Sequence, residues 1–205
     1  MIAQVGPKFT YNDERHEYRF DGEIVPSITQ IIAPYTDYSK IPRNILQDKQ
    51  AWGNSVHKYL EMLDRDQLDV VAIPESAEGA PNIRAVVENW AEICHNEPYF
   101  FLAIERPLYS NTYKFAGTAD RITTKFPLEL KTSLPTKDVC LAVEVQLAAQ
   151  AQLAYENGLI KELPEETFSW HTTEQGVWTK KTHDRKRGWN IFMCLLTANN
   201  YFNRG

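Results

Sequence analysis

The clearest pattern in the chain is an alternation of apolar and charged residues over Pro127–Thr132. Leu128 and Leu130 alternate there with Glu129 and Lys131. Because successive side chains of a β-strand point to opposite faces, both leucines face one side and both charged groups face the other. The pattern predicts a strand that is anchored in the core and presents a carboxylate and an ammonium together.

Two further apolar stretches, Phe101–Tyr109 and Tyr113–Thr123, predict strands just before this one. Asp120 lies toward the end of the second of these stretches, nine positions before Glu129. If the two strands pair, Asp120 reaches the same point as Glu129 and Lys131. Two carboxylates and an ammonium gathered in this way suit a hard divalent cation and an activated water.

Helical periodicity marks three other segments. Pro42–Leu63 has apolar residues at spacings of three and four, and Asn82–His95 follows as a second helix. Val139–Asn157 is apolar on nearly all sides, so we expect a largely buried helix that ends at Gly158 in a left-handed cap. The acidic stretch Asp66–Pro81 is typical of a loop.

Each end of the chain predicts a hairpin. Phe9–Val25 reads as a hairpin in which FTYND is followed by a polar turn and then by HEYRF and DGEIV, with Asp21-Gly22 as a tight turn. Ser27 is a plausible helix cap after it. The C-terminal part is expected to contain two strands and a last helix, at Phe168–Thr173, Gly176–Thr182 and Asp184–Tyr201.

A sheet followed by a buried helix and further strands fits one mixed α/β/α layer better than two domains. At 205 residues the chain has room for one full core. We therefore expect a single domain over residues 1–205 of the α/β (α+β mixed) class, with a central mixed β-sheet flanked by helices. An N-terminal hairpin arm would span about 9–25, and a C-terminal hairpin plus helix about 168–202.

Composition narrows the functional classes. The chain is 43% hydrophobic with mixed charges, and it has no apolar run near the ~20 residues of a membrane span, so we expect a folded protein with no membrane partner. Its three cysteines are far apart in apolar segments, which favours buried free thiols in a cytoplasmic protein and no iron–sulfur cluster; they are Cys94, Cys140 and Cys194. No Gly-rich phosphate loop is present, so we expect no nucleotide cofactor.

The net charge of −5 argues against a protein that simply coats nucleic acid, but it is compatible with local binding. One basic stretch lies near the C-terminus. It is either a solvated loop and helix start or a patch that neutralises phosphates, in which case the contacting residues are Lys180, Lys181, Arg185, Lys186 and Arg187.

Three isolated polar residues have both an ordinary and a functional explanation. His57 borders the apolar face of its helix, with Gly53 one turn earlier leaving space, so it is either a packed boundary residue or a metal ligand. Gln146 lies inside an apolar helix surface, where a buried amide usually bonds to backbone. Glu105 lies in a strand, where an outward-facing surface carboxylate is the default.

In chain order these residues form short motifs. A helix over Gly53–Glu61 carries His57, Gly117–Asp120 is a GxxD motif, Glu129–Lys131 is an ExK motif, and QLAAQ begins at Gln146. Together they resemble the PD-(D/E)XK nuclease superfamily, within it the RecB-like exonuclease branch of phages and mitochondrial genome maintenance. The resemblance spans roughly residues 15–160, and it includes the segments Tyr18–Gly22 and Val25–Thr29. It departs from the family where Gln150 replaces the tyrosine of QLxxY, which would alter substrate stacking or position.

The resemblance implies a restriction-endonuclease-like core and a metal-dependent exonuclease that hydrolyses phosphodiester bonds in DNA. It also implies a role in phage DNA recombination, replication or degradation in the host cytoplasm, with a recombination or single-strand-binding protein as a candidate partner. One or two Mg²⁺ or Mn²⁺ ions would be held by His57, Asp120, Glu129 and the backbone carbonyl of Leu130.

The remaining roles also follow from the resemblance. Lys131 would orient or help deprotonate the attacking water, Gln146 would orient the nucleophile, Lys131 or the phosphate, and Glu105 would support the site. Ser27 and Thr29 would donate hydrogen bonds to the DNA backbone, although helix capping explains them equally well.

Two other functions remain open. A structure-specific endonuclease of the same fold would nick closed circular DNA, whereas an exonuclease needs an end. A non-catalytic DNA-binding or host-interaction protein on a nuclease fold is the second alternative, and the presence of Asp120, Glu129 and Lys131 together speaks against it.

Overall fold

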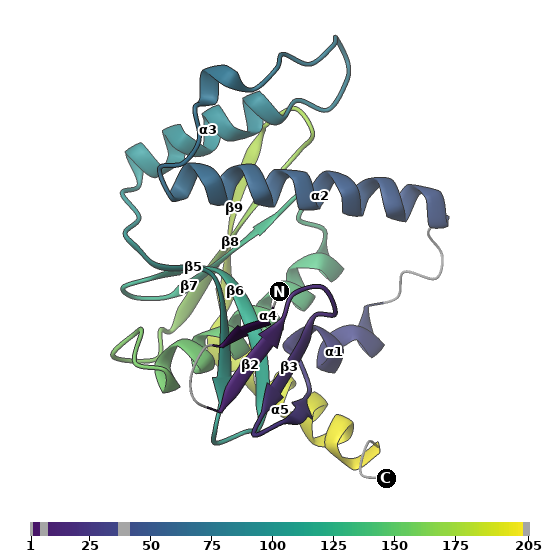
Figure 1. Cartoon of the computed structure of the whole chain (residues 1–205), viewed down its shortest axis with the longest axis vertical. Coiled ribbons are helices and arrows are strands. Elements are labelled where there is room, and N and C mark those ends of the chain that lie inside the picture. The colour runs from purple at the N-terminus through teal and green to yellow at the C-terminus, as the bar shows by residue number, and fades with distance from the viewer. Residues whose placement is uncertain (1, 5–7, 37–41, 203–205) are drawn as a thin grey trace.

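The computed structural model describes residues 2–4, 8–36 and 42–202, and its centre is a five-stranded mixed β-sheet (Figure 1). In spatial order its strands are β5 (Phe101–Ser110), β6 (Phe115–Thr123), β7 (Pro127–Lys131), β8 (Glu166–Thr172) and β9 (Trp178–Asp184). β7 and β8 pair in parallel, and the other neighbours are antiparallel. Because a parallel pair needs a crossover, the helix α4 (Lys137–Glu156) connects them.

Helices cover both faces of this sheet, in the arrangement of Figure 1. On one face lie α2 (Arg43–Asp64) and α3 (Ile83–Asn96), with the one-turn 3₁₀ helix η2 (Val70–Ala72) between them. On the other lie α4, α5 (Arg185–Phe202) and the short α1 (Ile28–Ile32), which leads into η1 (Ala33–Tyr35). Each face has its own buried apolar cluster. The chain is thus a mixed α/β protein with a central sheet flanked by helices, and the predicted fold class is confirmed.

The alternation along β7 is confirmed. Leu128 and Leu130 are buried in the cluster shared with α2 and α3. Glu129 and Lys131 instead form hydrogen bonds with Gln146 of α4, on the opposite face. The two leucines therefore anchor a strand whose charged pair projects beneath α4.

The N-terminal segment forms a four-stranded antiparallel sheet, not the single hairpin that the sequence predicted. Its strands are β1 (Ile2–Gln4), β2 (Phe9–Asn12), β3 (Glu17–Phe20) and β4 (Glu23–Val25). The predicted tight turn at Asp21-Gly22 is confirmed, since the two residues have φ angles of 52° and 85°. It connects β3 to β4. Phe9 and Phe20 stack on Tyr109 of β5, so this sheet packs on the central one.

The predicted helices begin and end within a few residues of the observed ones. Gly158 has φ 69° after α4, as expected of a left-handed cap, and Asp184 accepts a hydrogen bond from the Arg187 amide at the start of α5. The stretch predicted as an acidic loop differs by containing η2. Among the described helices, none combines the length and apolarity needed to cross a membrane.

The prediction that all three cysteines are buried is wrong. Cys94 and Cys140 are half-buried, and Cys194 is exposed. The buried positions of α5 include Gly188, Phe192 and Leu196, spaced four residues apart. Cys194 lies midway between the last two and therefore points away from that face.

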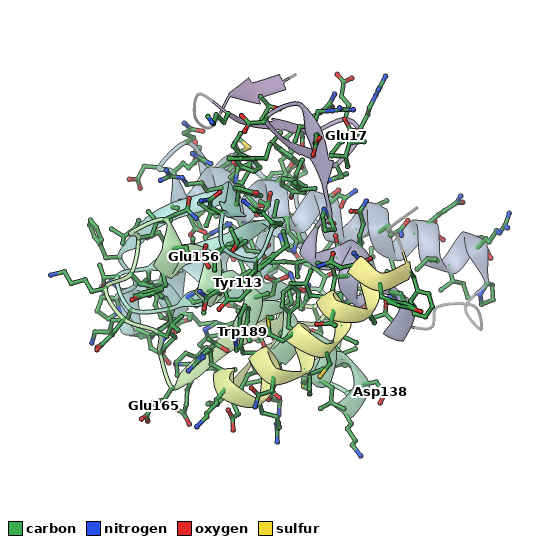
Figure 2. The ribbon with its side chains drawn as sticks, turned by 90° about the horizontal axis from the view of Figure 1, so that it is seen from below. Glu17, Tyr113, Asp138, Glu156, Glu165 and Trp189 are labelled. Carbon is green, nitrogen blue, oxygen red and sulfur yellow. The ribbon has the colours of Figure 1, made fainter. Side chains whose placement is uncertain are left out.

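α5 packs closely against α4 and the β5–β6 turn. Figure 2 shows Trp189 of α5 beside Tyr113, and their ring centroids are 5.0 Å apart. At Gly188 the two helix backbones approach so closely that a Cβ atom would lie 2.5 Å from the carbonyl oxygen of Glu144 and 3.0 Å from the Cβ of Ala148. The absence of a side chain at this position is therefore a packing requirement.

Gly188→Ala tests this contact. Alanine favours a helix by about 1 kcal/mol over glycine, but the clash with backbone should cost about 1–3 kcal/mol, so we expect a lower melting temperature. Asn190→Ala, at an exposed position of the same helix, is the matched control and should not lower it. A melting temperature that rises in Gly188→Ala, measured by circular dichroism, would contradict the close packing of α4 and α5.

Candidate active site

A cavity of about 400 Å³ lies between the N-terminal sheet, α2, α4 and the central sheet. Many of its lining residues are those that the sequence singled out: Ser27, Thr29, His57, Glu105, Asp120, Glu129, Lys131 and Gln146. These residues come from five elements and the start of α1, spread over more than half of the chain. The fold therefore brings these eight predicted site residues into one place.

Asp120 lies where β6 and β7 separate. The backbone pairs recorded between these two strands are Arg121 with Leu128 and Ile122 with Pro127. Beyond them, the Asp120 Oδ2 atom accepts a hydrogen bond of 2.8 Å from the amide of Leu130. A side chain thus takes over from backbone pairing, which fixes the carboxylate between the strands. The carbonyl of Leu130 as a metal ligand stays a prediction.

Glu129 is buried and held by three donors. Its Oε1 atom accepts hydrogen bonds from Lys131 Nζ at 2.6 Å and Gln146 Nε2 at 2.7 Å, and its Oε2 atom accepts one from Gln150 Nε2 at 2.9 Å. Burial raises the pKa of Glu129, the neighbouring Asp120 raises it further, and Lys131 opposes the rise. The ammonium and two amides compensate this carboxylate for the loss of water.

Gln150 donates a hydrogen bond to Glu129, which the sequence analysis did not predict. It was noted as a departure from a family tyrosine with consequences for the substrate, but its side chain is fully buried and bonds to Glu129. Gln146 and Gln150 are four residues apart, so both lie on the same face of α4. That spacing was the available signal for a second amide at Glu129.

His57, Glu105 and Asp120 form a second group next to the first. The His57 Nδ1 atom is 3.7 Å from Glu105 Oε1 and 3.8 Å from Asp120 Oδ2, and one ligand atom of each residue lies within 4.8 Å of the others. Burial lowers the pKa of His57, but the two carboxylates outweigh this effect and raise it above its usual value. Burial also raises the pKa of Asp120. An imidazole and two carboxylates at this spacing are suitable donors for a divalent cation.

Glu105 is not the outward-facing surface carboxylate that its strand position predicted by default. Its φ angle is 47°, in the left-handed region that non-glycine residues rarely adopt. This backbone conformation interrupts the regular alternation of β5 and turns the carboxylate toward His57 and Arg121. The group of residues that could hold a cation therefore contains Glu105, whereas both oxygens of Glu129 accept hydrogen bonds from its three donors.

Two charged residues next to this group were missed by the sequence analysis. The guanidinium of Arg121 is fully buried, and its Nε atom donates to Asp64 Oδ2 at 2.6 Å. Burial raises the pKa of Asp64, and both Arg121 and the indole of Trp90 oppose that rise. In the sequence, Arg121 could have been noticed as a charged residue within a mostly apolar strand, where a buried charge needs a partner.

Ser27 caps α1, as expected. Its Oγ atom accepts a hydrogen bond from the Gln30 amide at 3.1 Å, and the Gln30 side chain accepts one from the Ser27 amide at 2.9 Å. The Ser27 and Thr29 hydroxyls are 3.0 Å apart, and both residues line the cavity. Capping is therefore confirmed, while contact with DNA stays a prediction.

The basic C-terminal stretch forms β9 and the start of α5. Lys180 pairs with Glu97 and lies over three aromatic rings, and Arg187 donates two hydrogen bonds of 2.7 Å to Glu144. Arg185 donates to a backbone carbonyl, and Lys181 and Lys186 are half-buried and exposed, respectively. Within the described part of the chain, none of the five predicted DNA-binding residues of this stretch lines the cavity.

The comparisons with known proteins concern the fold. Neither a family model nor a curated protein matches the chain. A solved structure of a provisionally assigned exonuclease from Eubacterium rectale is similar with a TM-score of 0.50 and 14% identity, covering 72% of this chain and 64% of its own. An alkaline exonuclease from Laribacter hongkongensis aligns with a TM-score of 0.34 and 8% identity, covering 87% of this chain and 91% of its own.

The first similarity supports a restriction-endonuclease-like fold for this chain, with the five-stranded mixed sheet at its centre. The chain spans just under two thirds of the length of that protein.

A buried histidine pair lies beside the basic stretch. Ser169 Oγ is 2.9 Å from His171 Nε2 and 2.7 Å from His183 Nε2, and His171 Nδ1 is 3.0 Å from the carbonyl of Ser133. Burial lowers the pKa of both His171 and His183. Burial therefore favours the neutral form of both imidazoles in the folded protein.

This pair predicts a loss of stability in mild acid. An unfolded histidine has a pKa of ~6.5, and because the folded pKa is lower, the unfolded state binds more protons as the pH falls through that value. Between about pH 7.5 and pH 5.5, the free energy of unfolding should fall by up to about 1 kcal/mol more in the native sequence than in His183→Gln. Denaturant titrations at each pH measure it. Equal pH dependence of the two proteins would contradict a depressed pKa for His183.

Proposed function

We propose that this protein is a DNA exonuclease that hydrolyses phosphodiester bonds with Mg²⁺ or Mn²⁺. The observation that carries the proposal is the pair of adjacent groups in one cavity. The donors His57, Glu105 and Asp120 lie within 4.8 Å of one another, and the Glu129–Lys131 pair lines the same space. Ligands for a cation beside a positioned ammonium are suited to metal-assisted hydrolysis of a phosphodiester.

The local charge fits a divalent cation. Around the group, the carboxylates of Asp64, Glu105 and Asp120 face the single guanidinium of Arg121, which leaves two negative charges when His57 is neutral. Glu129 and Lys131 neutralise each other. One divalent ion would balance the charge of the group, and when bound it would supply Lewis-acid stabilisation and a more acidic water.

The other side chains would hold and orient the reactants. Lys131 Nζ donates to Glu129 and lies 3.3 Å from Gln146 Oε1, so the ammonium is fixed at the cavity. There it would orient the attacking water and stabilise negative charge on the phosphate. Gln146 bridges Glu129 and Lys131, and it would keep the ammonium in this position.

The residues that line the cavity favour a nucleic-acid substrate. The hydroxyls of Ser27 and Thr29 would donate to phosphate oxygens, and Tyr11 and His16 of the N-terminal segment also line the cavity. Basic residues of β9 and α5 would contact the DNA backbone outside the cavity.

The resemblance to RecB-like nucleases and the exonuclease assignment of the Eubacterium rectale protein favour end-dependent cleavage of DNA. We place this activity in phage DNA recombination, replication or degradation, in the cytoplasm of the host and beside a recombination or single-strand-binding protein.

Asp120→Ala should abolish divalent-metal-dependent degradation of DNA and leave the fold intact, because this carboxylate belongs to the cation group. Asp138→Ala, at an exposed acidic position at the start of α4 (Figure 2), is the control and should degrade DNA at the native rate. The assay uses linear, closed circular and single-stranded DNA with Mg²⁺ and with Mn²⁺. Undiminished cleavage by Asp120→Ala would eliminate this mechanism.

The same substrates separate the alternatives. Degradation of linear DNA with no nicking of closed circles is the expected result for an exonuclease. Nicking of closed circles would identify an endonuclease instead. If the native protein binds DNA but degrades none of the three substrates, the fold serves a non-catalytic role.

Thr29→Val separates DNA contact from capping at the start of α1. Valine matches the shape of threonine but lacks its hydroxyl, so we expect a higher KM for DNA with an unchanged melting temperature. Ser27→Ala removes the cap and should lower stability by about 1 kcal/mol. A native KM in Thr29→Val would show that this hydroxyl does not contact the substrate.

A further inference from the structure

We propose that the buried ion pair of Arg121 and Asp64 is a positioning device that holds the Glu105 carboxylate in the cation group. Neither member of the pair belongs to that group. The inference rests on the proposed function, since it concerns how His57, Glu105 and Asp120 are kept together. Arg121 and Asp64 are thus positioning residues that set the affinity of the site for a divalent cation.

The geometry of Arg121 carries the proposal. Its Nε atom donates to Asp64 Oδ2 at 2.6 Å, and its Nη1 atom donates to Glu105 Oε1 at 3.2 Å and to the backbone carbonyl of Asp120 at 2.7 Å. One rigid guanidinium therefore joins α2, β5 and β6 at the level of the site. The fixed fork of an arginine can hold three acceptors at set angles, which the single nitrogen of a lysine cannot reproduce.

Asp64 fixes the guanidinium from the other side. Its second oxygen, Oδ1, accepts a hydrogen bond of 3.0 Å from the indole of Trp90, which is fully buried in the cluster under α2 and α3. The position of Arg121 is thus tied to the apolar core and not to solvent. Only 4% of the Asp64 side chain is exposed, so water competes little for either partner.

Stability alone is a poor reason for this arrangement. Removing two charges from water costs several kcal/mol, which the attraction between them repays only with full hydrogen bonding. The Nη2 atom of Arg121 is buried without a hydrogen-bond partner among the described residues. The pair is therefore not optimised for its own stability, whereas its bonds to Glu105 and the Asp120 backbone are well suited to holding these two residues in place.

The backbone of Glu105 needs such support. Its left-handed φ of 47° costs about 1–3 kcal/mol in a non-glycine residue. Ile104 and Arg106 pair with Arg121 and Ala119, so Glu105 lies directly across from Asp120. The Arg121 contact favours the strained conformation in which the Glu105 carboxylate points at His57.

The test measures Mn²⁺ binding by isothermal titration calorimetry, without any assay of activity. The double variant Arg121→Met and Asp64→Asn removes both charges at once, and the substituted asparagine can still accept from Trp90. We expect its circular dichroism spectrum to be native and its Mn²⁺ affinity to fall by about 10–100-fold, as for other residues that orient metal ligands. A folded double variant with native affinity would overturn the proposal.

Arg65→Met is the matched control. The Arg65 guanidinium donates to the carbonyl of Ile104 at 2.9 Å and to Glu61, so it also touches β5 beside Glu105 but does not bond to the Glu105 carboxylate. Its Mn²⁺ affinity should be native. If the double variant fails to fold, Arg121→Lys decides, because it keeps the charge and loses the fork. A native affinity in that variant would equally overturn the proposal.

A thermodynamic cycle shows whether Arg121 acts through Glu105. Glu105→Gln should weaken Mn²⁺ binding, and adding Arg121→Lys to it should weaken binding little further, because both changes remove the same contribution. Fully additive losses would contradict action through Glu105. Asp120→Ala keeps the two proposals distinct: native Mn²⁺ binding in this variant would refute the cation site itself, whereas lost binding there with native binding in Arg121→Lys would refute the positioning role alone.

Discussion

The hydrogen bond from the Leu130 amide to the Asp120 carboxylate is the interaction on which the site depends. It lies where β6 and β7 stop pairing through their backbones, so a side chain fills the place of a ladder bond. Because Leu130 is buried in the core, the carboxylate is fixed to a rigid part of the sheet. The separation of β6 and β7 at this point opens the cavity, and the Asp120 side chain keeps the two strands connected there.

The acids at this point are in two different environments. Glu129 is closed in by Lys131, Gln146 and Gln150, so its charge is compensated within the protein. Glu105 and Asp120 interact with His57 and Arg121, and together with Asp64 they leave an excess of negative charge when His57 is neutral. In the proposed function, the first group orients the nucleophile and the second binds the cation, and both line the same cavity.

Local patterns predicted much of the fold and part of the site. The alternation around Glu129 placed its strand and its face correctly, because the period of a strand depends on neighbouring residues alone. The Arg121–Asp64 pair joins residues 57 positions apart and leaves no local periodicity. The left-handed backbone of Glu105 was equally hidden, since it reflects tertiary contacts and not the preference of a glutamate. The packing of the N-terminal sheet on the central sheet through Phe9, Phe20 and Tyr109 was also hidden, because it joins residues far apart in the chain.

The most direct test of the account is anomalous scattering at the manganese edge from a crystal soaked in Mn²⁺. We expect a peak between the side chains of His57, Glu105 and Asp120, within bonding distance of at least two of them. A well-ordered cavity with no peak at saturating Mn²⁺ would contradict the central claim that these residues hold a divalent cation.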